Sequence, residues 1–316
     1  MARAFGKSDM THKAFDVIVC GSLHLDIMVQ SPHLPRRDET AVGSAWGMKC
    51  GGKGGNQAVM AARMGASTAM IGRVGKDDFG RRLLDHLTAA RVDISGVSVD
   101  ETAGSGMSVA IVEATGEYGA VIVSGSNLAI DPASIAGQWA DLGGARVLIL
   151  QNEIPEAANI AAARAAKAAG AHVVLNAAPA RGMARELLDL VDLLVVNRVE
   201  AEMLSGAPVT DAESAIRAMP ALGGGRKDVV ITLGGEGLVV QAKGEEPAMI
   251  APHRVTVVST HGAGDCFLGM LCADLAQGKP LMEACRAANS AAAAFVSMTE
   301  EAQREVTRAT LQARTG

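Results

Sequence analysis

The chain has 316 residues, enough for one large α/β domain with an appendage or for two average domains. Hydrophobic residues make up 49% of the sequence and charged residues 20%, which excludes a disordered, coiled-coil or collagen-like chain. A net charge of −5 and an aromatic content of 3% argue against a nucleic-acid partner, because such binding usually needs a basic surface and aromatic side chains on which bases stack.

The N-terminal segment is predicted to be a disordered leader over residues 1–14, since it lacks the apolar core of a signal peptide. Met10 is an alternative start. No apolar run of the sequence approaches the roughly 20 residues that cross a bilayer, so we expect no membrane partner. The five cysteines contain no CxxC pair, which is typical of reduced thiols in a cytoplasmic protein.

Apolar runs alternate with helix-like segments along the chain. Short β-branched runs predict buried strands, in chain order, at Asp16–Cys20, Thr68–Val74, Arg146–Leu150, His172–Leu175, Leu193–Val196 and Val229–Leu233. Helical spacing predicts helices at Asn56–Met64, Phe79–Ala90 and Pro155–Ala169. Strands that alternate with helices favour a mostly parallel central sheet covered on both faces, and ligands of such sheets bind at the carboxyl ends of the strands.

Two stretches depart from this alternation and indicate antiparallel hairpins. They are Ile27–Val29 with Thr40–Met48, and Met107–Val112 with Ala120–Val123. We interpret them as a small β-appendage over roughly 24–50 and 104–124, carried by a main domain that makes up the rest of 15–316.

A first glycine cluster, residues 51–56, opens the helix predicted at Asn56–Met64. Glycines let the backbone approach a ligand, and a helix N-terminus offers free N–H groups. The cluster is not a Walker A loop, because Gly54 stands where Ser or Thr would bind Mg²⁺. The polar Lys53 and Asn56 among the glycines favour a binding loop over a merely flexible turn.

A second glycine cluster runs from Val257 to Asp265 and leads into a helix at Cys266–Ala276. The expected order of strand, glycine turn and helix start is the geometry of an anion hole. Asp265 is then either a helix N-cap or a general base beside a phosphate site.

Polar groups also follow other predicted strands. Asn197 and Glu200 stand three residues apart at a helix start, where they either hold hydrated Mg²⁺ or cap the helix. Thr232–Gly237 forms a turn that would pass under a nucleotide. Asp26 and Glu153 follow strands as well, and each is either ordinary surface or part of a site.

Taken in order, these motifs resemble the PfkB, or ribokinase-like, family of carbohydrate kinases, from about Phe15 to about Thr299. The N-terminal family signature matches Gly52–Asn56 with Gly65 and Gly75, and the C-terminal signature matches Gly262–Asp265. The family's NxxE motif matches Asn197–Glu200, and its nucleotide turn matches Thr232–Gly237. A closer match to the ribokinase branch is carried by Gly52–Ala58, Glu153–Pro155 and Leu175–Ala180.

The resemblance implies a three-layer α/β sandwich with a β-lid, and ATP-dependent phosphorylation of the primary hydroxyl of a small sugar, with ribose as first choice. It implies sugar binding by His24, Asp26, Gly52, Lys53, Asn56 and Glu153. It implies catalysis by Asp265 together with the turn Gly262, Ala263 and Gly264. The backbone N–H groups of Ala263, Gly264 and Asp265 would stabilise the transferring phosphoryl group. It implies an ATP site at Asn197, Thr232, Gly234, Gly237 and Asn289, with Glu200 ordering Mg²⁺ through water. The lid would close over the sugar and form a homodimer.

Three departures from the family pattern bear on specificity and ions. His24 replaces an Asn, and its bulkier imidazole would change which sugar fits. Ser259 stands where potassium-activated members have Asp, and the Met298–Gln303 segment is shorter than the usual cation loop. A serine oxygen attracts a cation less than a carboxylate does, so we expect little activation by K⁺.

Three other functions compete with the sugar-kinase hypothesis. A nucleoside kinase of the same fold would need room for a base, which the sequence does not measure. A non-catalytic sugar-binding regulator is disfavoured by the intact Asp265 and its glycine turn. A dinucleotide oxidoreductase is disfavoured as well, because no GxGxxG follows the first predicted strand.

Overall fold

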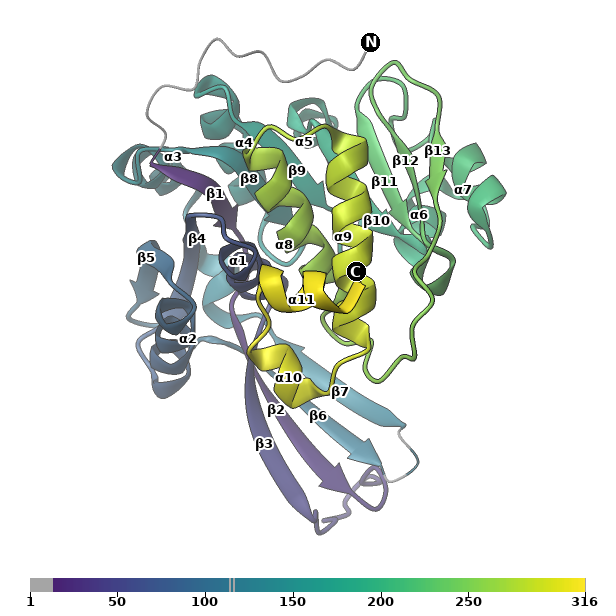
Figure 1. Ribbon diagram of the computed structural model, residues 1–316. Coiled ribbons are helices and arrows are strands. Elements are labelled where there is room, and N and C mark those ends of the chain that lie inside the picture. The colour runs from purple at the N-terminus through teal and green to yellow at the C-terminus, as the bar shows by residue number, and fades with distance from the viewer. Residues whose placement is uncertain (1–13, 114, 116, 316) are drawn as a thin grey trace.

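A nine-stranded sheet forms the centre of the computed structural model, which describes residues 14–113, 115 and 117–315 (Figure 1). The predicted leader lies outside the described residues except for Ala14, and Met10 lies outside them as well. In spatial order the strands are β13 (Ala248–Ile250), β12 (Leu238–Gln241), β11 (Asp228–Thr232), β10 (Leu193–Asn197), β9 (His172–Asn176), β8 (Ala145–Gln151), β1 (Phe15–Cys20), β4 (Thr68–Gly75) and β5 (Val92–Asp100).

The strands from β11 to β5 are parallel, and β12 and β13 are antiparallel additions at one edge. This confirms the predicted mostly parallel sheet. From β1 the chain moves to β4 on one side and later returns to β8 on the other. The strand order therefore reverses between β1 and β8, and the carboxyl ends at such a reversal are where open α/β sheets bind ligands.

Helices cover both faces of this sheet because successive strand residues point to opposite sides. In β1, Val17 and Val19 belong to one apolar core, and Ile18 and Cys20 belong to the other. The first core is covered by α1 (Lys53–Arg63), α2 (Asp78–Ala89), α8 (Ala263–Ala276), α9 (Leu281–Val296) and α11 (Arg308–Thr315). The second is covered by α3 (Pro132–Asp141), α4 (Glu156–Ala168), α5 (Arg185–Leu190), α6 (Arg198–Ser205) and α7 (Ala212–Ala218). The predicted three-layer sandwich is thus confirmed.

A second sheet of four strands projects from one end of the sandwich (Figure 1). Its order is β3 (Ala45–Gly51), β2 (His24–Ser31), β6 (Gly106–Glu113) and β7 (Tyr118–Val123). Both predicted antiparallel pairs are present, but residues 40–44 lie outside any strand. A parallel pairing of β2 with β6, which the sequence did not predict, joins the two pairs and sets Asp26 opposite Ser108.

The strand expected before the second glycine cluster is absent from the described structure. Val257 and Val258 are both 56% exposed, and the Val258 N–H donates to the carbonyl of Val296 at the end of α9. Their β-branched side chains favour extended backbone, yet no neighbouring strand is there to pair with them. Helix α1 also begins three residues earlier than predicted, at Lys53, so its first turn contains Gly54 and Gly55 of the first cluster.

Candidate active site

A cavity of about 480 Å³ lies at the carboxyl ends of β1 and β8–β11, between the main sheet and the four-stranded sheet. Most of the predicted site residues line it, namely His24, Asp26, Gly52, Lys53, Asn56, Glu153, Asn197, Glu200, Thr232, Gly262, Ala263, Gly264 and Asp265. The structure therefore brings together residues from the first, second and last thirds of the chain. Four predicted residues do not line the cavity, namely Gly234, Gly237, Ser259 and Asn289.

Asp265 is held from α1 rather than by its own helix. It is the third residue of α8, but the N-cap is Gly262, so the N-cap interpretation of Asp265 is wrong. Asn56 Nδ2 donates to Asp265 Oδ2 at 3.1 Å, and Gln57 Nε2 donates to Oδ1 at 3.2 Å. Burial raises the pKa of the Asp265 carboxyl, while the charge of Lys53 and the two amide hydrogen bonds oppose that rise.

The start of α8 offers backbone donors beside this carboxylate. Gly262 adopts a left-handed conformation with φ 78°, which turns the chain sharply into the helix. The N–H groups of Gly264 and Asp265 make no hydrogen bond to the described residues, as expected in the first turn of a helix. The Ala263 N–H donates to the Thr260 carbonyl at 3.2 Å, so only two of the three predicted donors are free for an anion.

The N-terminus of α1 is tied to the main sheet by Glu153. Its Oε2 accepts the backbone N–H of Lys53 at 2.8 Å and the hydroxyl of Ser22 at 2.5 Å. A Cβ on Gly54 would lie 2.6 Å from the backbone nitrogen of Ser22, so α1 reaches this position only with glycine there. The glycine cluster thus packs backbone against backbone and fixes where Asn56 stands.

The four-stranded sheet contributes Asp26 to the cavity. Ser108 Oγ, on the neighbouring strand, donates to Asp26 Oδ1 at 2.5 Å. His24 is buried, with Nε2 3.3 Å from the Nδ2 of Asn127 and Nδ1 3.9 Å from Glu153 Oε2. The two hydrogens of that amide go to the carbonyls of Leu23 and Ser124, so the imidazole lies against the amide and lines the cavity beside Glu153.

Asn197 and Glu200 form a reciprocal capping box at the start of α6. Asn197 Oδ1 accepts the Glu200 N–H, and Glu200 Oε2 accepts the Asn197 N–H, both at 2.8 Å. Burial raises the pKa of the Glu200 carboxyl, and the Asn197 hydrogen bond and the Lys53 charge act against it. The helix-cap interpretation of Asn197 and Glu200 is therefore correct, and both residues also line the cavity.

The predicted residues outside the cavity have other contacts. Gly234 and Gly237 belong to a 3₁₀ turn, Gly234–Glu236, and its C-cap. Asn289 Nδ2 donates to the Ala251 carbonyl at 2.8 Å. The carbonyl of Ser259 accepts the side-chain amide of Gln303, a buried residue.

Sequence reasoning did not assign several residues that line or support the cavity. These are Ser22, Gln57, Ser108, Asn127 and Asn176. Gln57 directly follows the assigned Asn56, and Asn176 ends a predicted strand, so position alone could have flagged both. Ser108 carries no such signal, because its place depends on the unpredicted β2–β6 pairing. Asn127 carries none either, because it meets Leu23 and His24 only through contacts across more than 100 positions.

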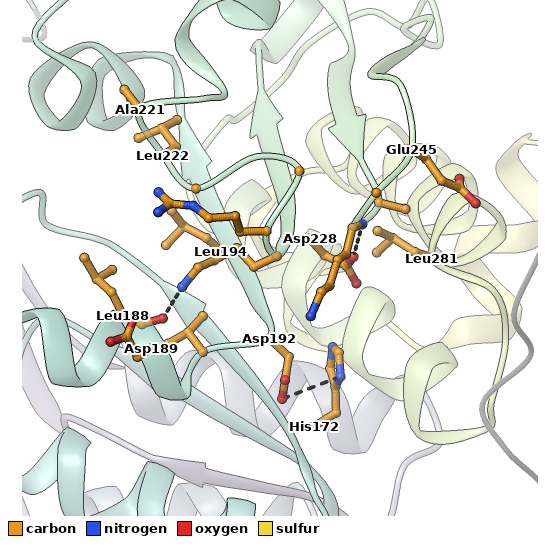
Figure 2. A pocket seen from close by; sticks show the side chains of 18 of the residues that line it. His172, Leu188, Asp189, Asp192, Leu194, Ala221, Leu222, Asp228, Glu245 and Leu281 are labelled. Carbon is orange, nitrogen blue, oxygen red and sulfur yellow. Dashed lines mark hydrogen bonds and ion pairs between the residues drawn. The ribbon is translucent and has the colours of Figure 1, made fainter.

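A larger cavity, of about 1110 Å³, lies at the opposite edge of the sheet (Figure 2). His172, Asp192 and Asp228 in this cavity stand at or just before the amino ends of β9, β10 and β11. None of the predicted site residues lines it. The smaller cavity, where carboxylates and free N–H groups converge, is therefore the candidate active site. No helix in the described part of the chain is both long and apolar enough to cross a membrane.

Comparisons with known proteins bear on the family of the chain. The profile described as pfkB family carbohydrate kinase matches residues 14–305. Similar curated proteins include ribokinase of Haemophilus influenzae, 34% identical over 88% of this chain and 91% of its own length, and ribokinase of Bacillus subtilis, 34% identical over 89% and 92%. A structure of Arabidopsis thaliana ribokinase complexed with ribose and ATP superposes with a TM-score of 0.87 at 27% identity, covering 95% of this chain and 98% of that chain.

Proposed function

We propose that this chain, which belongs to the pfkB family of carbohydrate kinases, transfers the terminal phosphoryl group of ATP to the primary hydroxyl of ribose. Family membership makes it a sugar kinase, a phosphotransferase with an alcohol group as acceptor. The choice of ribose is supported by the curated relatives named ribokinase and by the similar structure that holds ribose and ATP.

One observation carries the proposal. A half-buried carboxylate, Asp265, lies in the same cavity as the two free N–H groups at the start of α8. A carboxylate can accept the proton of an attacking hydroxyl, and helix N-terminal N–H groups stabilise negative charge on a transferring phosphoryl group. We assign these roles to Asp265 and to the backbone of Gly264 and Asp265.

The sugar is proposed to lie between the two sheets. Asp26 on the lid would accept hydrogen bonds from sugar hydroxyls, and Lys53, Asn56 and Glu153 would contact the sugar from the main domain. Because the lid strands supply Asp26, Ser108 and Ile122 to the cavity, closure of the lid would exclude water from the reacting groups.

A substrate panel tests this function. Purified protein is assayed for ADP release with ribose, other small sugars and nucleosides. Ribose is expected to give the highest kcat/KM. A nucleoside as the preferred substrate would establish the alternative nucleoside kinase, and binding of sugar without ADP release would establish a non-catalytic regulator.

The nucleotide is proposed to lie over the ends of β10 and β11, beside Asn197 and Thr232, which line the cavity. Glu200 fits Mg²⁺ held through water, since its carboxylate borders the cavity and uses one oxygen in the capping box. Bound Mg²⁺ would neutralise phosphate charge. Participation of Gly234, Gly237 and Asn289 in ATP binding stays a prediction, as does a cytoplasmic location.

We expect K⁺ to change the turnover less than about twofold when it replaces Na⁺ at fixed Mg²⁺ and ionic strength. Gln303 Nε2 lies 3.0 Å from the Phe295 carbonyl and 3.4 Å from those of Ser259 and Met298. An amide nitrogen already occupies the space among these oxygens, so a monovalent ion finds no vacant site there.

Two variants extend this ion test. Gln303→Ala, which frees the three carbonyls, should make turnover respond to K⁺. Ser259→Asp should gain K⁺ sensitivity only if the rest of the site survives. A tenfold rise of the wild-type rate with K⁺ would show that cations compete successfully with the Gln303 amide.

A homodimer through the lid is proposed from its exposed apolar side chains, among them Trp46, Tyr118 and Val121, each at least 68% exposed. Val121→Lys should weaken self-association at least about tenfold, because it would bury an unpaired charge. Sedimentation velocity over a concentration series measures this effect. The matched control is Val199→Lys on α6, where a valine that is 63% exposed lies outside the lid strands. Equal behaviour of both variants would contradict the lid interface.

A further inference from the structure

Gln57 connects the carboxylate of Asp265 to the end of strand β9. Its side chain is fully buried on α1. Nε2 lies 3.2 Å from Asp265 Oδ1 and 3.1 Å from the Oδ1 of Asn176, the last residue of β9. A single amide group therefore donates to two acceptors that come from different layers of the fold.

The orientation of this amide follows from its neighbours. Asn176 Nδ2 donates to the carbonyl of Val195 at 3.2 Å, so Asn176 presents its oxygen to Gln57. Both groups that face Gln57 are then acceptors, and only an NH₂ group can satisfy them. The Oε1 of Gln57 is buried and makes no hydrogen bond to any described residue. Such an unpaired acceptor is destabilising, which indicates that the donor is the part of the side chain that the site needs.

Close helix packing brings the donor within reach. A Cβ on Gly269 of α8 would lie 2.6 Å from the Cβ of Met60 on α1, so the two helices meet nearly backbone to backbone. Consecutive residues of α1, Asn56 and Gln57, consequently reach the two oxygens of one carboxylate. Asp265 is restrained on both sides before any ligand arrives.

We propose that Gln57 is a positioning residue for phosphoryl transfer, which keeps the Asp265 carboxylate ionised and correctly oriented by bridging it to Asn176. Hydrogen bonds donated to a carboxylate favour its charged form. Desolvation of Asp265 and the nearby Glu153 carboxylate act in the opposite direction, and the Lys53 charge acts together with the two amide donors to favour the charged form. This inference rests on the proposed function, in which Asp265 accepts the proton of the sugar hydroxyl.

The test compares Gln57→Leu and Gln57→Glu with the wild type. Both variants lose the donor, and the ionised Glu also places a like charge beside Asp265. We expect kcat at pH 7 to fall about tenfold or more, because hydrogen bonds to charged groups are among the stronger ones. The acid limb of the pH–rate profile should move to higher pH, further for Glu than for Leu, with the KM for ATP nearly unchanged.

Gln151→Leu is the matched control. Gln151 is another fully buried glutamine, it pairs with Asn176 in the β8–β9 register, and neither of its side-chain polar atoms has a partner among the described residues. Its replacement is expected to leave the acid limb in place. If Gln57→Leu lowers the melting temperature and kcat but its profile superimposes on the wild-type profile, the role of Gln57 is structural and the proposal is overturned.

A second readout does not depend on turnover. Protein labelled with ¹³C at aspartate carboxyls is titrated by NMR, and the Asp265 signal is assigned by its loss in Asp265→Asn. The proposal requires Gln57→Leu to raise the pH at which this signal titrates, and an unchanged titration would overturn it. A wild type that phosphorylates no sugar would instead contradict the proposed function, and the titration would still decide the effect of Gln57 on Asp265.

Discussion

Asp265→Asn is expected to slow phosphoryl transfer by roughly 10²–10⁴-fold while ATP binding stays largely intact. The substitution keeps the size of the side chain but removes the oxygen that would accept the proton of the sugar hydroxyl. The carboxylate now accepts hydrogen bonds from the amides of Asn56 and Gln57. In the variant one of those donors faces an NH₂ group instead, which adds a local rearrangement to the loss of the base.

Steady-state turnover with ribose and calorimetric titration with ATP measure the two expected results separately. Asp78→Asn is a suitable control, because it makes the same change at an exposed position on α2. Turnover of Asp265→Asn within about threefold of the wild type would remove Asp265 from the role of general base.

The pH dependence of the wild-type rate should show the titration of the Asp265 carboxyl. Burial raises the pKa of Asp265, and a general base works only in its deprotonated form. The rate is therefore expected to fall as the pH drops through that raised pKa, at a higher pH than an ordinary aspartate would give. In Asp265→Asn, the residual rate should lose this acid limb.

The convergence of polar residues at one edge of the sheet was predictable from local patterns. Short β-branched runs located β8, β10 and β11, and the parallel arrangement sends their carboxyl ends to the same edge. Glu153, Asn197 and Thr232 follow or end those strands, so the fold brings them to one cavity. The local pattern alone did not decide whether such residues cap a helix or bind a ligand. The family resemblance supplied the binding roles.

Long-range contacts were not predictable in the same way. Gln57 and Asp265 are 208 positions apart, and their contact depends on how closely α1 packs against α8. Gln303 reaches the carbonyl of Ser259 across 44 positions through a similar tertiary contact. The prediction of a strand at Val257 and Val258 was wrong for the opposite reason. The local β-propensity of these residues was present, but the described structure offers no neighbouring strand to pair with them.

Asp26→Ala is expected to weaken sugar binding strongly and ATP binding little. Each hydrogen bond from a sugar hydroxyl to this carboxylate contributes about 1.5–3 kcal/mol, so losing one should weaken affinity roughly ten- to hundredfold. The register of β2 with β6 places Ser108 against Oδ1 of Asp26 and leaves Oδ2 without a hydrogen-bond partner among the described residues.

Separate calorimetric titrations with ribose and with ATP test this expectation. Ser108→Ala provides the matched variant, because it removes the protein donor and keeps the carboxylate, so its effect on ribose affinity should be smaller. Asp26 lies on the lid, whereas the proposed nucleotide site lies over the ends of β10 and β11 in the main sheet. Equal weakening of both ligands by Asp26→Ala would show that the carboxylate supports the whole cavity rather than the sugar, and it would contradict the assignment.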